Sequence, residues 1–278
     1  MNIAAIARNP KNSPGMCDKD RAILLSTVEK LLERGDNVLL LTEEQYAADN
    51  NRYDIIVSMS RNSSTLQKLS QAQINGTIVI NTPQAVCNCS RKNLVYHLNK
   101  HNIPQPTHKI ISSKDSAPST GYPIWIKKSN GWSEHKDDVC YAATPHEAEK
   151  ALLEFKNRGI EEVLICNHIQ GDIIKFYGIG DSFFKLSYPN PNDTKFGLEK
   201  INGTTRHYPF NIEKLKSIAL LAARSIGVEI FGGDAIITPE GSIYIIDIND
   251  FPSFSAVRHE AAQAISNLIK TKSNEYRR

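Results

Sequence analysis

Three side chains with oxygen donors fall within one predicted hairpin in the last fifth of the sequence. Asp234 lies on the first strand, and Asp247 and Asn249 lie on the second. Side chains two positions apart in a strand share a face, so Asp247 and Asn249 point the same way. Carboxylate and amide oxygens suit Mg²⁺ (or Mn²⁺), which retains water ligands and readily bridges to phosphate. The hairpin therefore predicts a metal site that a nucleotide completes.

A structural role for the same residues is the alternative. Asp247 and Asn249 would then cap the turn before Pro252. Both strands are otherwise strongly apolar, as in Ala235–Ile237 and Ile245-Ile246, and acidic side chains in such surroundings are costly unless they are paired. We therefore prefer the metal site.

The segment Asp247-Ile248-Asn249-Asp250-Phe251-Pro252, with Asp234 upstream, resembles the C-terminal signature of the ATP-grasp superfamily. That superfamily includes D-alanine–D-alanine ligase, glutathione synthetase, the ribosomal-protein glutamate ligases and the inositol trisphosphate 5/6-kinases. Most of the ligases have Glu where this chain has Asp247, and the Asp-x-Asn-x-Phe-Pro form is closer to the inositol kinases. The resemblance extends over nearly the whole chain and implies ATP and Mg²⁺ (or Mn²⁺) as cofactors.

The resemblance also implies which cations hold the phosphates. Lys127 ends the run Pro123–Ile126 and matches the superfamily's lysine on the α- and β-phosphates, with Lys128 beside it as a competitor for that role. Lys92 matches the other ATP-binding lysine, and a cation at a helix start is unfavourable unless an anion is near. Without a ligand, Lys127 would extend to solvent.

The adenine and ribose contacts follow from two further likenesses. The segment Val163–Ile169 resembles the strand that holds adenine through main-chain groups, with the Cys166 carbonyl and the Ile169 amide as the expected partners. Gly171–Lys175 resembles the motif Gly-x-Asp-x-x-Arg/Lys. In that motif the Asp accepts from ribose and the basic residue reaches the γ-phosphate, which assigns these roles to Asp172 and Lys175. A salt-bridged strand pair is the alternative for both.

Three more polar positions are candidates. Arg206 corresponds to the region in which the ligases carry an arginine that binds the acyl phosphate. Arg258 follows Pro252 closely and either contributes a cation or lies on a helix surface. The loop Ser129–His135 either folds over phosphates or is a solvated turn, and the role of His135 is left open.

The predicted reaction is the ATP-dependent joining of a carboxylate to an amine. A substrate carboxylate accepts the γ-phosphate, and the amine attacks the resulting acyl phosphate. Lys175 and Arg206 would stabilise the charge on the transferring group. No protein nucleophile is required, and the sequence shows no convincing Ser/His/Asp or Cys/His set. The expected partners are a small-molecule or peptide carboxylate, an amine and, for assembly, a second copy of the chain.

Two other functions are considered. A kinase of the inositol polyphosphate type would phosphorylate a hydroxyl and would need a basic pocket, to which Lys195, Lys200, Arg206 and His207 would contribute. A non-catalytic ATP-binding module is the second alternative, and a complete set of metal donors argues against it. We prefer the ligase because ligases dominate the superfamily.

The first third of the chain must position one side of such a site. Apolar runs predict four strands, at Ile3–Ala7, Asn37–Leu41, Asp54–Met59 and Thr77–Ile80, and a helical stripe spans Asp18–Arg34. Alternating strands and helices indicate a doubly wound parallel sheet that binds ligands at the carboxyl ends of its strands. Those ends carry Arg8-Asn9-Pro10, Ser58–Arg61 and Asn81-Thr82-Pro83. No glycine fingerprint follows the first strand, which argues against NAD.

The remainder changes character after a helix at Arg91–Lys100 and a hinge at Ile103–Thr107. A small unit is predicted from strands at Thr107–Ser112, Tyr122–Lys127, Asp138–Ala142 and Val163–Asn167 and a helix at His146–Asn157. Beyond it we predict hairpins at Asp172–Ser187 and Glu229–Ile248 and helices at Ile212–Ile226 and Ser255–Ile269.

The expected fold class is α/β and α+β, an ATP-grasp fold. Residues 1–85 form the N-terminal α/β domain and residues 86–278 the ATP-grasp domain. The latter divides into a lid subdomain at about 107–167 and a metal-binding antiparallel-sheet subdomain at about 168–278. These boundaries follow from the change of pattern and from the resemblance.

Composition sets the class of protein and its surroundings. The 278 residues are 40% hydrophobic and 23% charged, with a net charge of +3. We therefore expect a globular protein with no nucleic-acid partner. We expect no membrane helix and no signal peptide, because no apolar run approaches about 20 residues. Five unpaired cysteines favour free thiols and a cytoplasmic location over a metal site.

Overall fold

The computed structural model describes residues 1–189 and 201–276, the side chain of Tyr276 excepted. Its first sheet is parallel throughout, as the sequence predicts, and its strand order is β2-β1-β3-β4. The strands are β1 (Asn2–Ile6), β2 (Asn37–Leu41), β3 (Ile55–Ser58) and β4 (Ile78–Ile80). Because all four run the same way, Arg8 and Arg61 follow β1 and β3 at one edge of the sheet.

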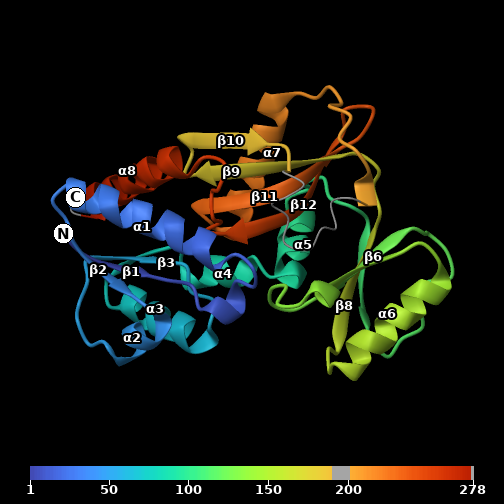
Figure 1. Ribbon diagram of the computed structural model, residues 1–278, viewed down its shortest axis with the longest axis horizontal. Coiled ribbons are helices and arrows are strands. Elements are labelled where there is room, and N and C mark those ends of the chain that lie inside the picture. Colours follow the sequence, from blue (N-terminus) through green and yellow to red (C-terminus); the bar gives the residue numbers. More distant parts are fainter. Residues whose placement is uncertain (190–200, 277–278) are drawn as a thin grey trace.

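Helices cover both faces of this sheet (Figure 1). Helices α1 (Cys17–Glu33) and α8 (Arg258–Tyr276) pack on one face and contact each other. The other face is covered by three shorter helices: α2 (Glu43–Ala48), α3 (Ser63–Ile74) and α4 (Pro83–Asn88). Helix α1 buries Ile23, Leu24, Val28 and Leu31 of the predicted stripe, whereas Leu32 is exposed. The helix ends just before Gly35, whose positive φ of 84° suits a helix stop. Helices between these strands were expected from the sequence, but no bounds were predicted for α2, α3 or α4. A capping box of Thr42 and Gln45 starts α2.

The second sheet is antiparallel, in the order β5-β8-β6-β7. Its strands are β5 (His108–Ser112), β6 (Ile124–Lys128), β7 (Val139–Ala142) and β8 (Glu162–Asn167). Helix α6 (Pro145–Asn157) packs on one face against Ile124 and Ile126. Alternate residues of β6 therefore face away from α6. A 3₁₀ turn at Lys136–Asp138 precedes β7, and another at Pro10–Asn12 follows β1.

The third sheet is also antiparallel, in the order β10-β9-β11-β12. Its strands are β9 (Asp172–Ile179), β10 (Phe183–Ser187), β11 (Ile230–Ile237) and β12 (Ile243–Asp250). Helices α5 (Arg91–Lys100) and α7 (Ile212–Ile226) pack together against one face. Figure 1 shows the first and second sheets toward opposite ends of the molecule, with the third sheet between them.

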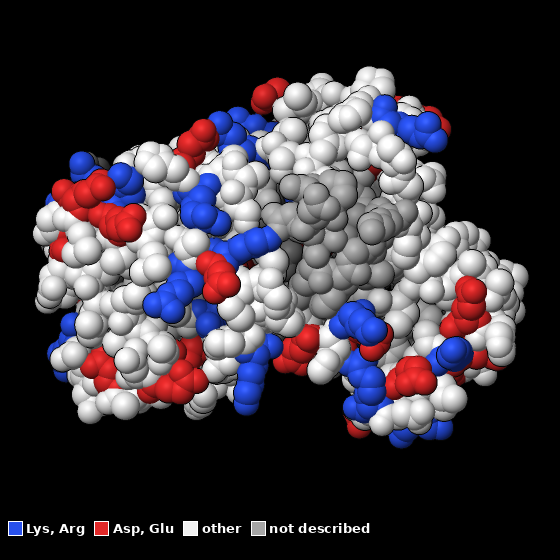
Figure 2. All heavy atoms as spheres, in the orientation of Figure 1, with Lys and Arg blue, Asp and Glu red and all other residues white. Residues whose placement is uncertain are grey.

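The surface visible in Figure 2 carries both signs of charge, interspersed over the first sheet's unit and over the second sheet with α6. Among the described helices, none combines the length and the apolar character needed to cross a membrane.

Candidate active site

A cavity of about 440 Å³ is lined by residues of the second and third sheets and by residues that follow strands of the first sheet. The second sheet contributes Trp125, Lys127 and Cys166, and the third contributes Lys175, Asp234 and Asp247. Residues that follow β1 and β3 also reach it. The cavity therefore lies between the residues that follow β1 and β3 and the C-terminal hairpin.

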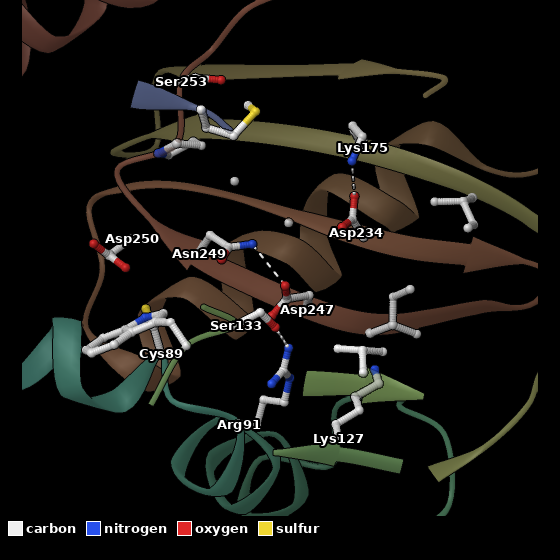
Figure 3. A pocket seen from close by; sticks show the side chains of 18 of the residues that line it. Cys89, Arg91, Lys127, Ser133, Lys175, Asp234, Asp247, Asn249, Asp250 and Ser253 are labelled. Atoms are coloured by element: carbon white, nitrogen blue, oxygen red, sulfur yellow. Dashed lines mark hydrogen bonds and ion pairs between the residues drawn. The ribbon is translucent and has the colours of Figure 1, made fainter. Parts of the chain in front are cut away.

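The predicted metal donors come together on β11 and β12 (Figure 3). Asp234 pairs with Asp247 across the two strands, and a bulge follows between Asp234 and Ala235. The Asn249 Nδ2 atom donates to Asp247 Oδ2 over 3.0 Å, so these two side chains share a face as expected. All three donors line the cavity. This fits a hard cation, whose remaining ligands would be phosphate and water oxygens.

The described residues hold no group of three or more His, Cys, Asp or Glu side chains arranged for a metal ion. The hairpin offers two carboxylates and an amide, which is fewer anionic ligands than a closed structural site uses. Such a set suits an ion that arrives with a nucleotide. Lys175 lies directly opposite Asp234 on β9, and its Nζ atom is 3.2 Å from Asp234 Oδ1.

Across the cavity, Lys127 projects from the face of β6 that turns away from α6 (Figure 3). Its neighbour Lys128 points elsewhere and forms an ion pair with Glu134 at 3.0 Å. Strand alternation thus places Lys127, and not Lys128, at the cavity.

The expectation for Lys92 requires correction. Its Nζ atom pairs with Glu162 at 2.7 Å, in a half-exposed ion pair, and the residue does not line the cavity. Arg91 lines it instead, donating to the Lys128 carbonyl at 3.0 Å and to Ser133 Oγ. Burial lowers the pKa of the Arg91 guanidinium, more than the attraction of Asp247 and then of Asp138 raises it. The first turn of α5 points its first residue inward and its second outward.

Asp172 and Arg206 are also placed elsewhere than expected. The Asp172 carboxylate is buried and accepts from the backbone N–H groups of Arg206 at 2.7 Å and Tyr208 at 2.8 Å. Neither Asp172 nor Arg206 lines the cavity, and Arg206 is exposed. For Asp172, strand alternation is the physical reason: Lys175 faces the cavity, so Asp172, three positions earlier, faces the opposite side of β9.

The expected adenine segment does reach the cavity, at Cys166 and Ile169. Cys166 pairs with Trp125 on one side and with His108 on the other, so its main-chain carbonyl lies within the sheet ladder. Burial raises the pKa of its thiol. Ile169 lies beyond the end of β8, and its carbonyl accepts from Asn202 Nδ2 over 3.3 Å. Of the two residues, only Ile169 has main-chain groups that lie outside the hydrogen-bonded ladder of the sheet.

The remaining candidate residues lie partly outside the cavity and partly outside the described residues. His135, His207 and Arg258 do not line the cavity. Lys195 and Lys200 lie outside the described residues. In the loop Ser129–His135, Gly131, Trp132 and Ser133 line the cavity.

A buried network of charges that lines the cavity was not singled out from the sequence. Asp250 accepts from Arg61 Nη2 at 2.6 Å and from Arg8 Nη2 at 3.2 Å, and Arg8 Nη1 donates to Asp20 at 2.8 Å. All four residues line the cavity. The sequence indicated only that Arg8 and Arg61 follow the strands β1 and β3 and so lie at the ligand-binding edge of the first sheet.

A tight turn carries the chain from β12 to α8 along this network. Phe251 and Phe254 adopt positive φ angles of 38° and 49°, which are costly for aromatic residues. Both rings are fully buried in the core beneath the first sheet, which holds the turn in place. Pro252 and Ser253, between them, line the cavity.

Comparison with known proteins agrees with this architecture. No family model matches the chain. A D-alanine–D-alanine ligase from Bacillus anthracis superposes with a TM-score of 0.69 at 12% identity, over 100% of this chain and 98% of that one. A RimK domain ATP-grasp protein from Sphaerobacter thermophilus gives 0.70 at 16% identity, over 97% and 100%. The chain has the ATP-grasp fold.

Sequence similarity reaches two synthases. Human N-acetylaspartylglutamate synthase A is 22% identical over 215 residues, which cover 70% of this chain and 51% of that protein. Beta-citrylglutamate synthase B of Danio rerio is 20% identical over 230 residues, covering 75% and 53%. The chain spans about half the length of these relatives.

Proposed function

We propose that this protein is an ATP-dependent carboxylate–amine ligase that binds Mg-ATP in the cavity between the second and third sheets. The observation that carries the proposal is the opposition of charges across the cavity. Asp234, Asp247 and Asn249 face it from the third sheet, and Lys127 and Arg91 reach it from the other side. Anionic phosphates bridging to a cation would satisfy both sides at once.

The described side chains support a division of labour. When bound, Mg²⁺ would neutralise charge on the phosphates, held by the two carboxylates and the amide of the hairpin. Lys127 and Arg91 would hold the phosphate chain in line for transfer. Lys175 would offset the charge on the transferring group, since its partner Asp234 would turn to the metal.

Solved structures and relatives support this proposal. A structure of the Bacillus anthracis ligase with ATP has the same fold, with a TM-score of 0.68 at 11% identity over 100% of this chain and 98% of that one. The two synthases are named for products that contain a glutamate joined to another acid. We infer that the acceptor of this protein is a small carboxylate and that an amine receives its acyl group.

The second sheet with its helix α6 is proposed to act as a lid. Its residues, about 107–167, follow the Pro104–Pro106 hinge, and its loop at Gly131–Ser133 reaches across the cavity. Closure would keep water from the γ-phosphate and from an acyl phosphate.

A labelled-oxygen experiment tests the reaction class. With Mg-ATP, amine and a carboxylate carrying ¹⁸O in its carboxyl group, a ligase moves one ¹⁸O into the phosphate that it releases, because the carboxylate oxygen attacks the γ-phosphorus and leaves with it. A kinase acting on a hydroxyl forms a phosphate monoester and releases no labelled phosphate. Phosphate release without label would contradict the acyl phosphate route.

A further inference from the structure

We propose that Arg61 binds a carboxylate of the acceptor substrate and that Trp132 of the lid loop closes over the same guanidinium. Acceptor binding and lid closure would then be coupled through one side chain. The inference rests on the proposed function and adds to it a residue that determines specificity for an anionic acceptor.

Arg61 is a buried cation with donors to spare. Its side chain is 6% exposed, and it lines the cavity. Its Nε and Nη2 atoms both donate to Asp250 Oδ1, at 2.9 and 2.6 Å. A guanidinium carries five N–H donors, and within the described part of the chain its Nη1 atom has no acceptor. The open donors suit the two oxygens of a carboxylate.

The charge around Arg61 also favours an added anion. Its one carboxylate partner among the described residues, Asp250, is shared with Arg8, which also pairs with Asp20, so Arg61 has no carboxylate of its own. Burial, followed by repulsion from Arg8, lowers the pKa of the Arg61 guanidinium. A second anion at its open edge would relieve both effects, because buried cations are stabilised by pairing.

Trp132 brings the lid loop onto this cation. The Arg61 Cζ atom lies 4.9 Å from the centre of the indole ring, within the range of a cation–π contact. Trp132 lies between β6 and β7 of the second sheet, whereas Arg61 follows β3 of the first. The contact therefore links two sheets that no shared strand connects.

The indole also has an unsatisfied donor. The Nε1 atom of Trp132 is buried, and no described residue accepts its hydrogen bond. A buried N–H without an acceptor is costly, and Trp132 lines the same cavity as Arg61. A carboxylate seated on Arg61 provides acceptor oxygens next to this ring.

The chain has only two tryptophans, Trp125 and Trp132, so protein labelled with 5-fluorotryptophan gives two fluorine resonances. The spectrum of the Trp132→Phe variant lacks the Trp132 resonance and thereby assigns it. With Mg-ADP present, we titrate N-acetyl-L-aspartate, L-glutamate and succinate, with uncharged succinamide as the control. We expect a saturable shift of the Trp132 resonance with at least one carboxylate and none with succinamide.

Arg61→Lys then separates anion binding from a structural role. The substitution keeps the charge but loses the planar set of guanidinium donors, so the half-saturating carboxylate concentration should rise about tenfold or more. The half-saturating concentration of Mg-ATP should change by less than about threefold. Lys68→Met is the matched control, since Lys68 Nζ holds the Tyr46 and Asp49 carbonyls at 2.7 and 2.6 Å in the same unit, away from the cavity. It should lower stability and leave carboxylate binding unchanged.

Two results would overturn the inference. One is that none of the three carboxylates moves the Trp132 resonance in the presence of Mg-ADP, although the same protein binds Mg-ATP when measured separately, which leaves the proposed function standing. The other is that Arg61→Lys weakens carboxylate and Mg-ATP binding equally, as a general loss of structure would. Failure of the labelled protein to bind Mg-ATP would count against the proposed function and, with it, against this inference.

Discussion

At the scale of single residues, neighbouring basic side chains have opposite surroundings. Lys127 faces the cavity and Lys128 pairs with Glu134, while Arg91 faces the cavity and Lys92 pairs with Glu162. Matching a family motif to the sequence can be off by one position, so it cannot decide which of two neighbouring basic residues faces the site. The direction of each side chain depends on how its strand or helix turn packs. From the sequence, the choice between the two lysines of β6 was left open, and at α5 the expected contact was Lys92, whereas Arg91 is the residue that lines the cavity.

The pair at the start of α5 gives a direct comparison. Arg91→Met should raise the half-saturating ATP concentration about 10- to 100-fold, because a buried charged donor to the phosphates is lost. Lys92→Met removes only a half-exposed ion pair and should change it by less than about threefold. Steady-state kinetics of the two variants measures this. Equal effects, or a larger one for Lys92→Met, would return the phosphate contact to Lys92.

The metal donors are tested at Asp247. Asp247→Asn removes a charge without changing the shape of the side chain, so ATP turnover should fall by about 100-fold or more while the protein stays folded. Circular dichroism and thermal unfolding serve as controls for the fold. Near-normal ATP consumption by this variant at saturating substrate would contradict the assignment of the metal site.

At the scale of elements, the types of most strands and helices could be predicted from sequence, and the faces of some could not. The long apolar runs and the stripe of α1 are strong periodic signals, and they place β1 to β4 within a few residues. The motif Gly171–Lys175 was matched as a unit, yet Asp172 and Lys175 are three positions apart on one strand and must face opposite ways. Reading the alternation of β9 would have separated them from sequence alone.

The bulged pairing of β11 and β12 depends on a position without a side chain. A Cβ atom on Gly233 would overlap the Asp247 carbonyl oxygen and the Phe176 ring. Gly233→Ala should therefore lower the free energy of unfolding by about 1–3 kcal/mol, because the packed hairpin must shift. Gly203→Ala is not a suitable control, since its φ of 81° adds strain of its own. Chemical denaturation compares the variant with Ser182→Ala, on the exposed turn between β9 and β10.

At the scale of the whole molecule, a few buried charges join the first sheet to the third. Asp250 ends β12, and the arginines that it pairs with, Arg8 and Arg61, follow strands of the first sheet. The sequence predicted that these strand ends would face a ligand, because parallel strands meet at one edge. It could not show which acidic residue would meet them, since that contact spans 189 to 242 positions of the chain.

This junction should contribute strongly to stability. Asp250→Asn leaves two buried guanidinium groups without their shared carboxylate and should cost about 3–5 kcal/mol in free energy of unfolding. Arg224→Ala, which removes a pair with Asp181 that is more than half exposed, should cost about 0–1 kcal/mol. Urea denaturation of both variants measures the difference. A cost for Asp250→Asn no larger than that for Arg224→Ala would contradict a structural role for the network.

The central claim is that Mg-ATP binds between the lid and the third sheet, and hydrogen exchange with and without Mg-ATP tests it most directly. Exchange should slow in Val163–Ile169, where adenine would contact the main chain, and in Ser129–His135, where the loop would order over the phosphates. Helix α2 (Glu43–Ala48), which does not line the cavity, is the internal control and should not change. Unchanged exchange in both cavity segments at a saturating nucleotide concentration would contradict the account.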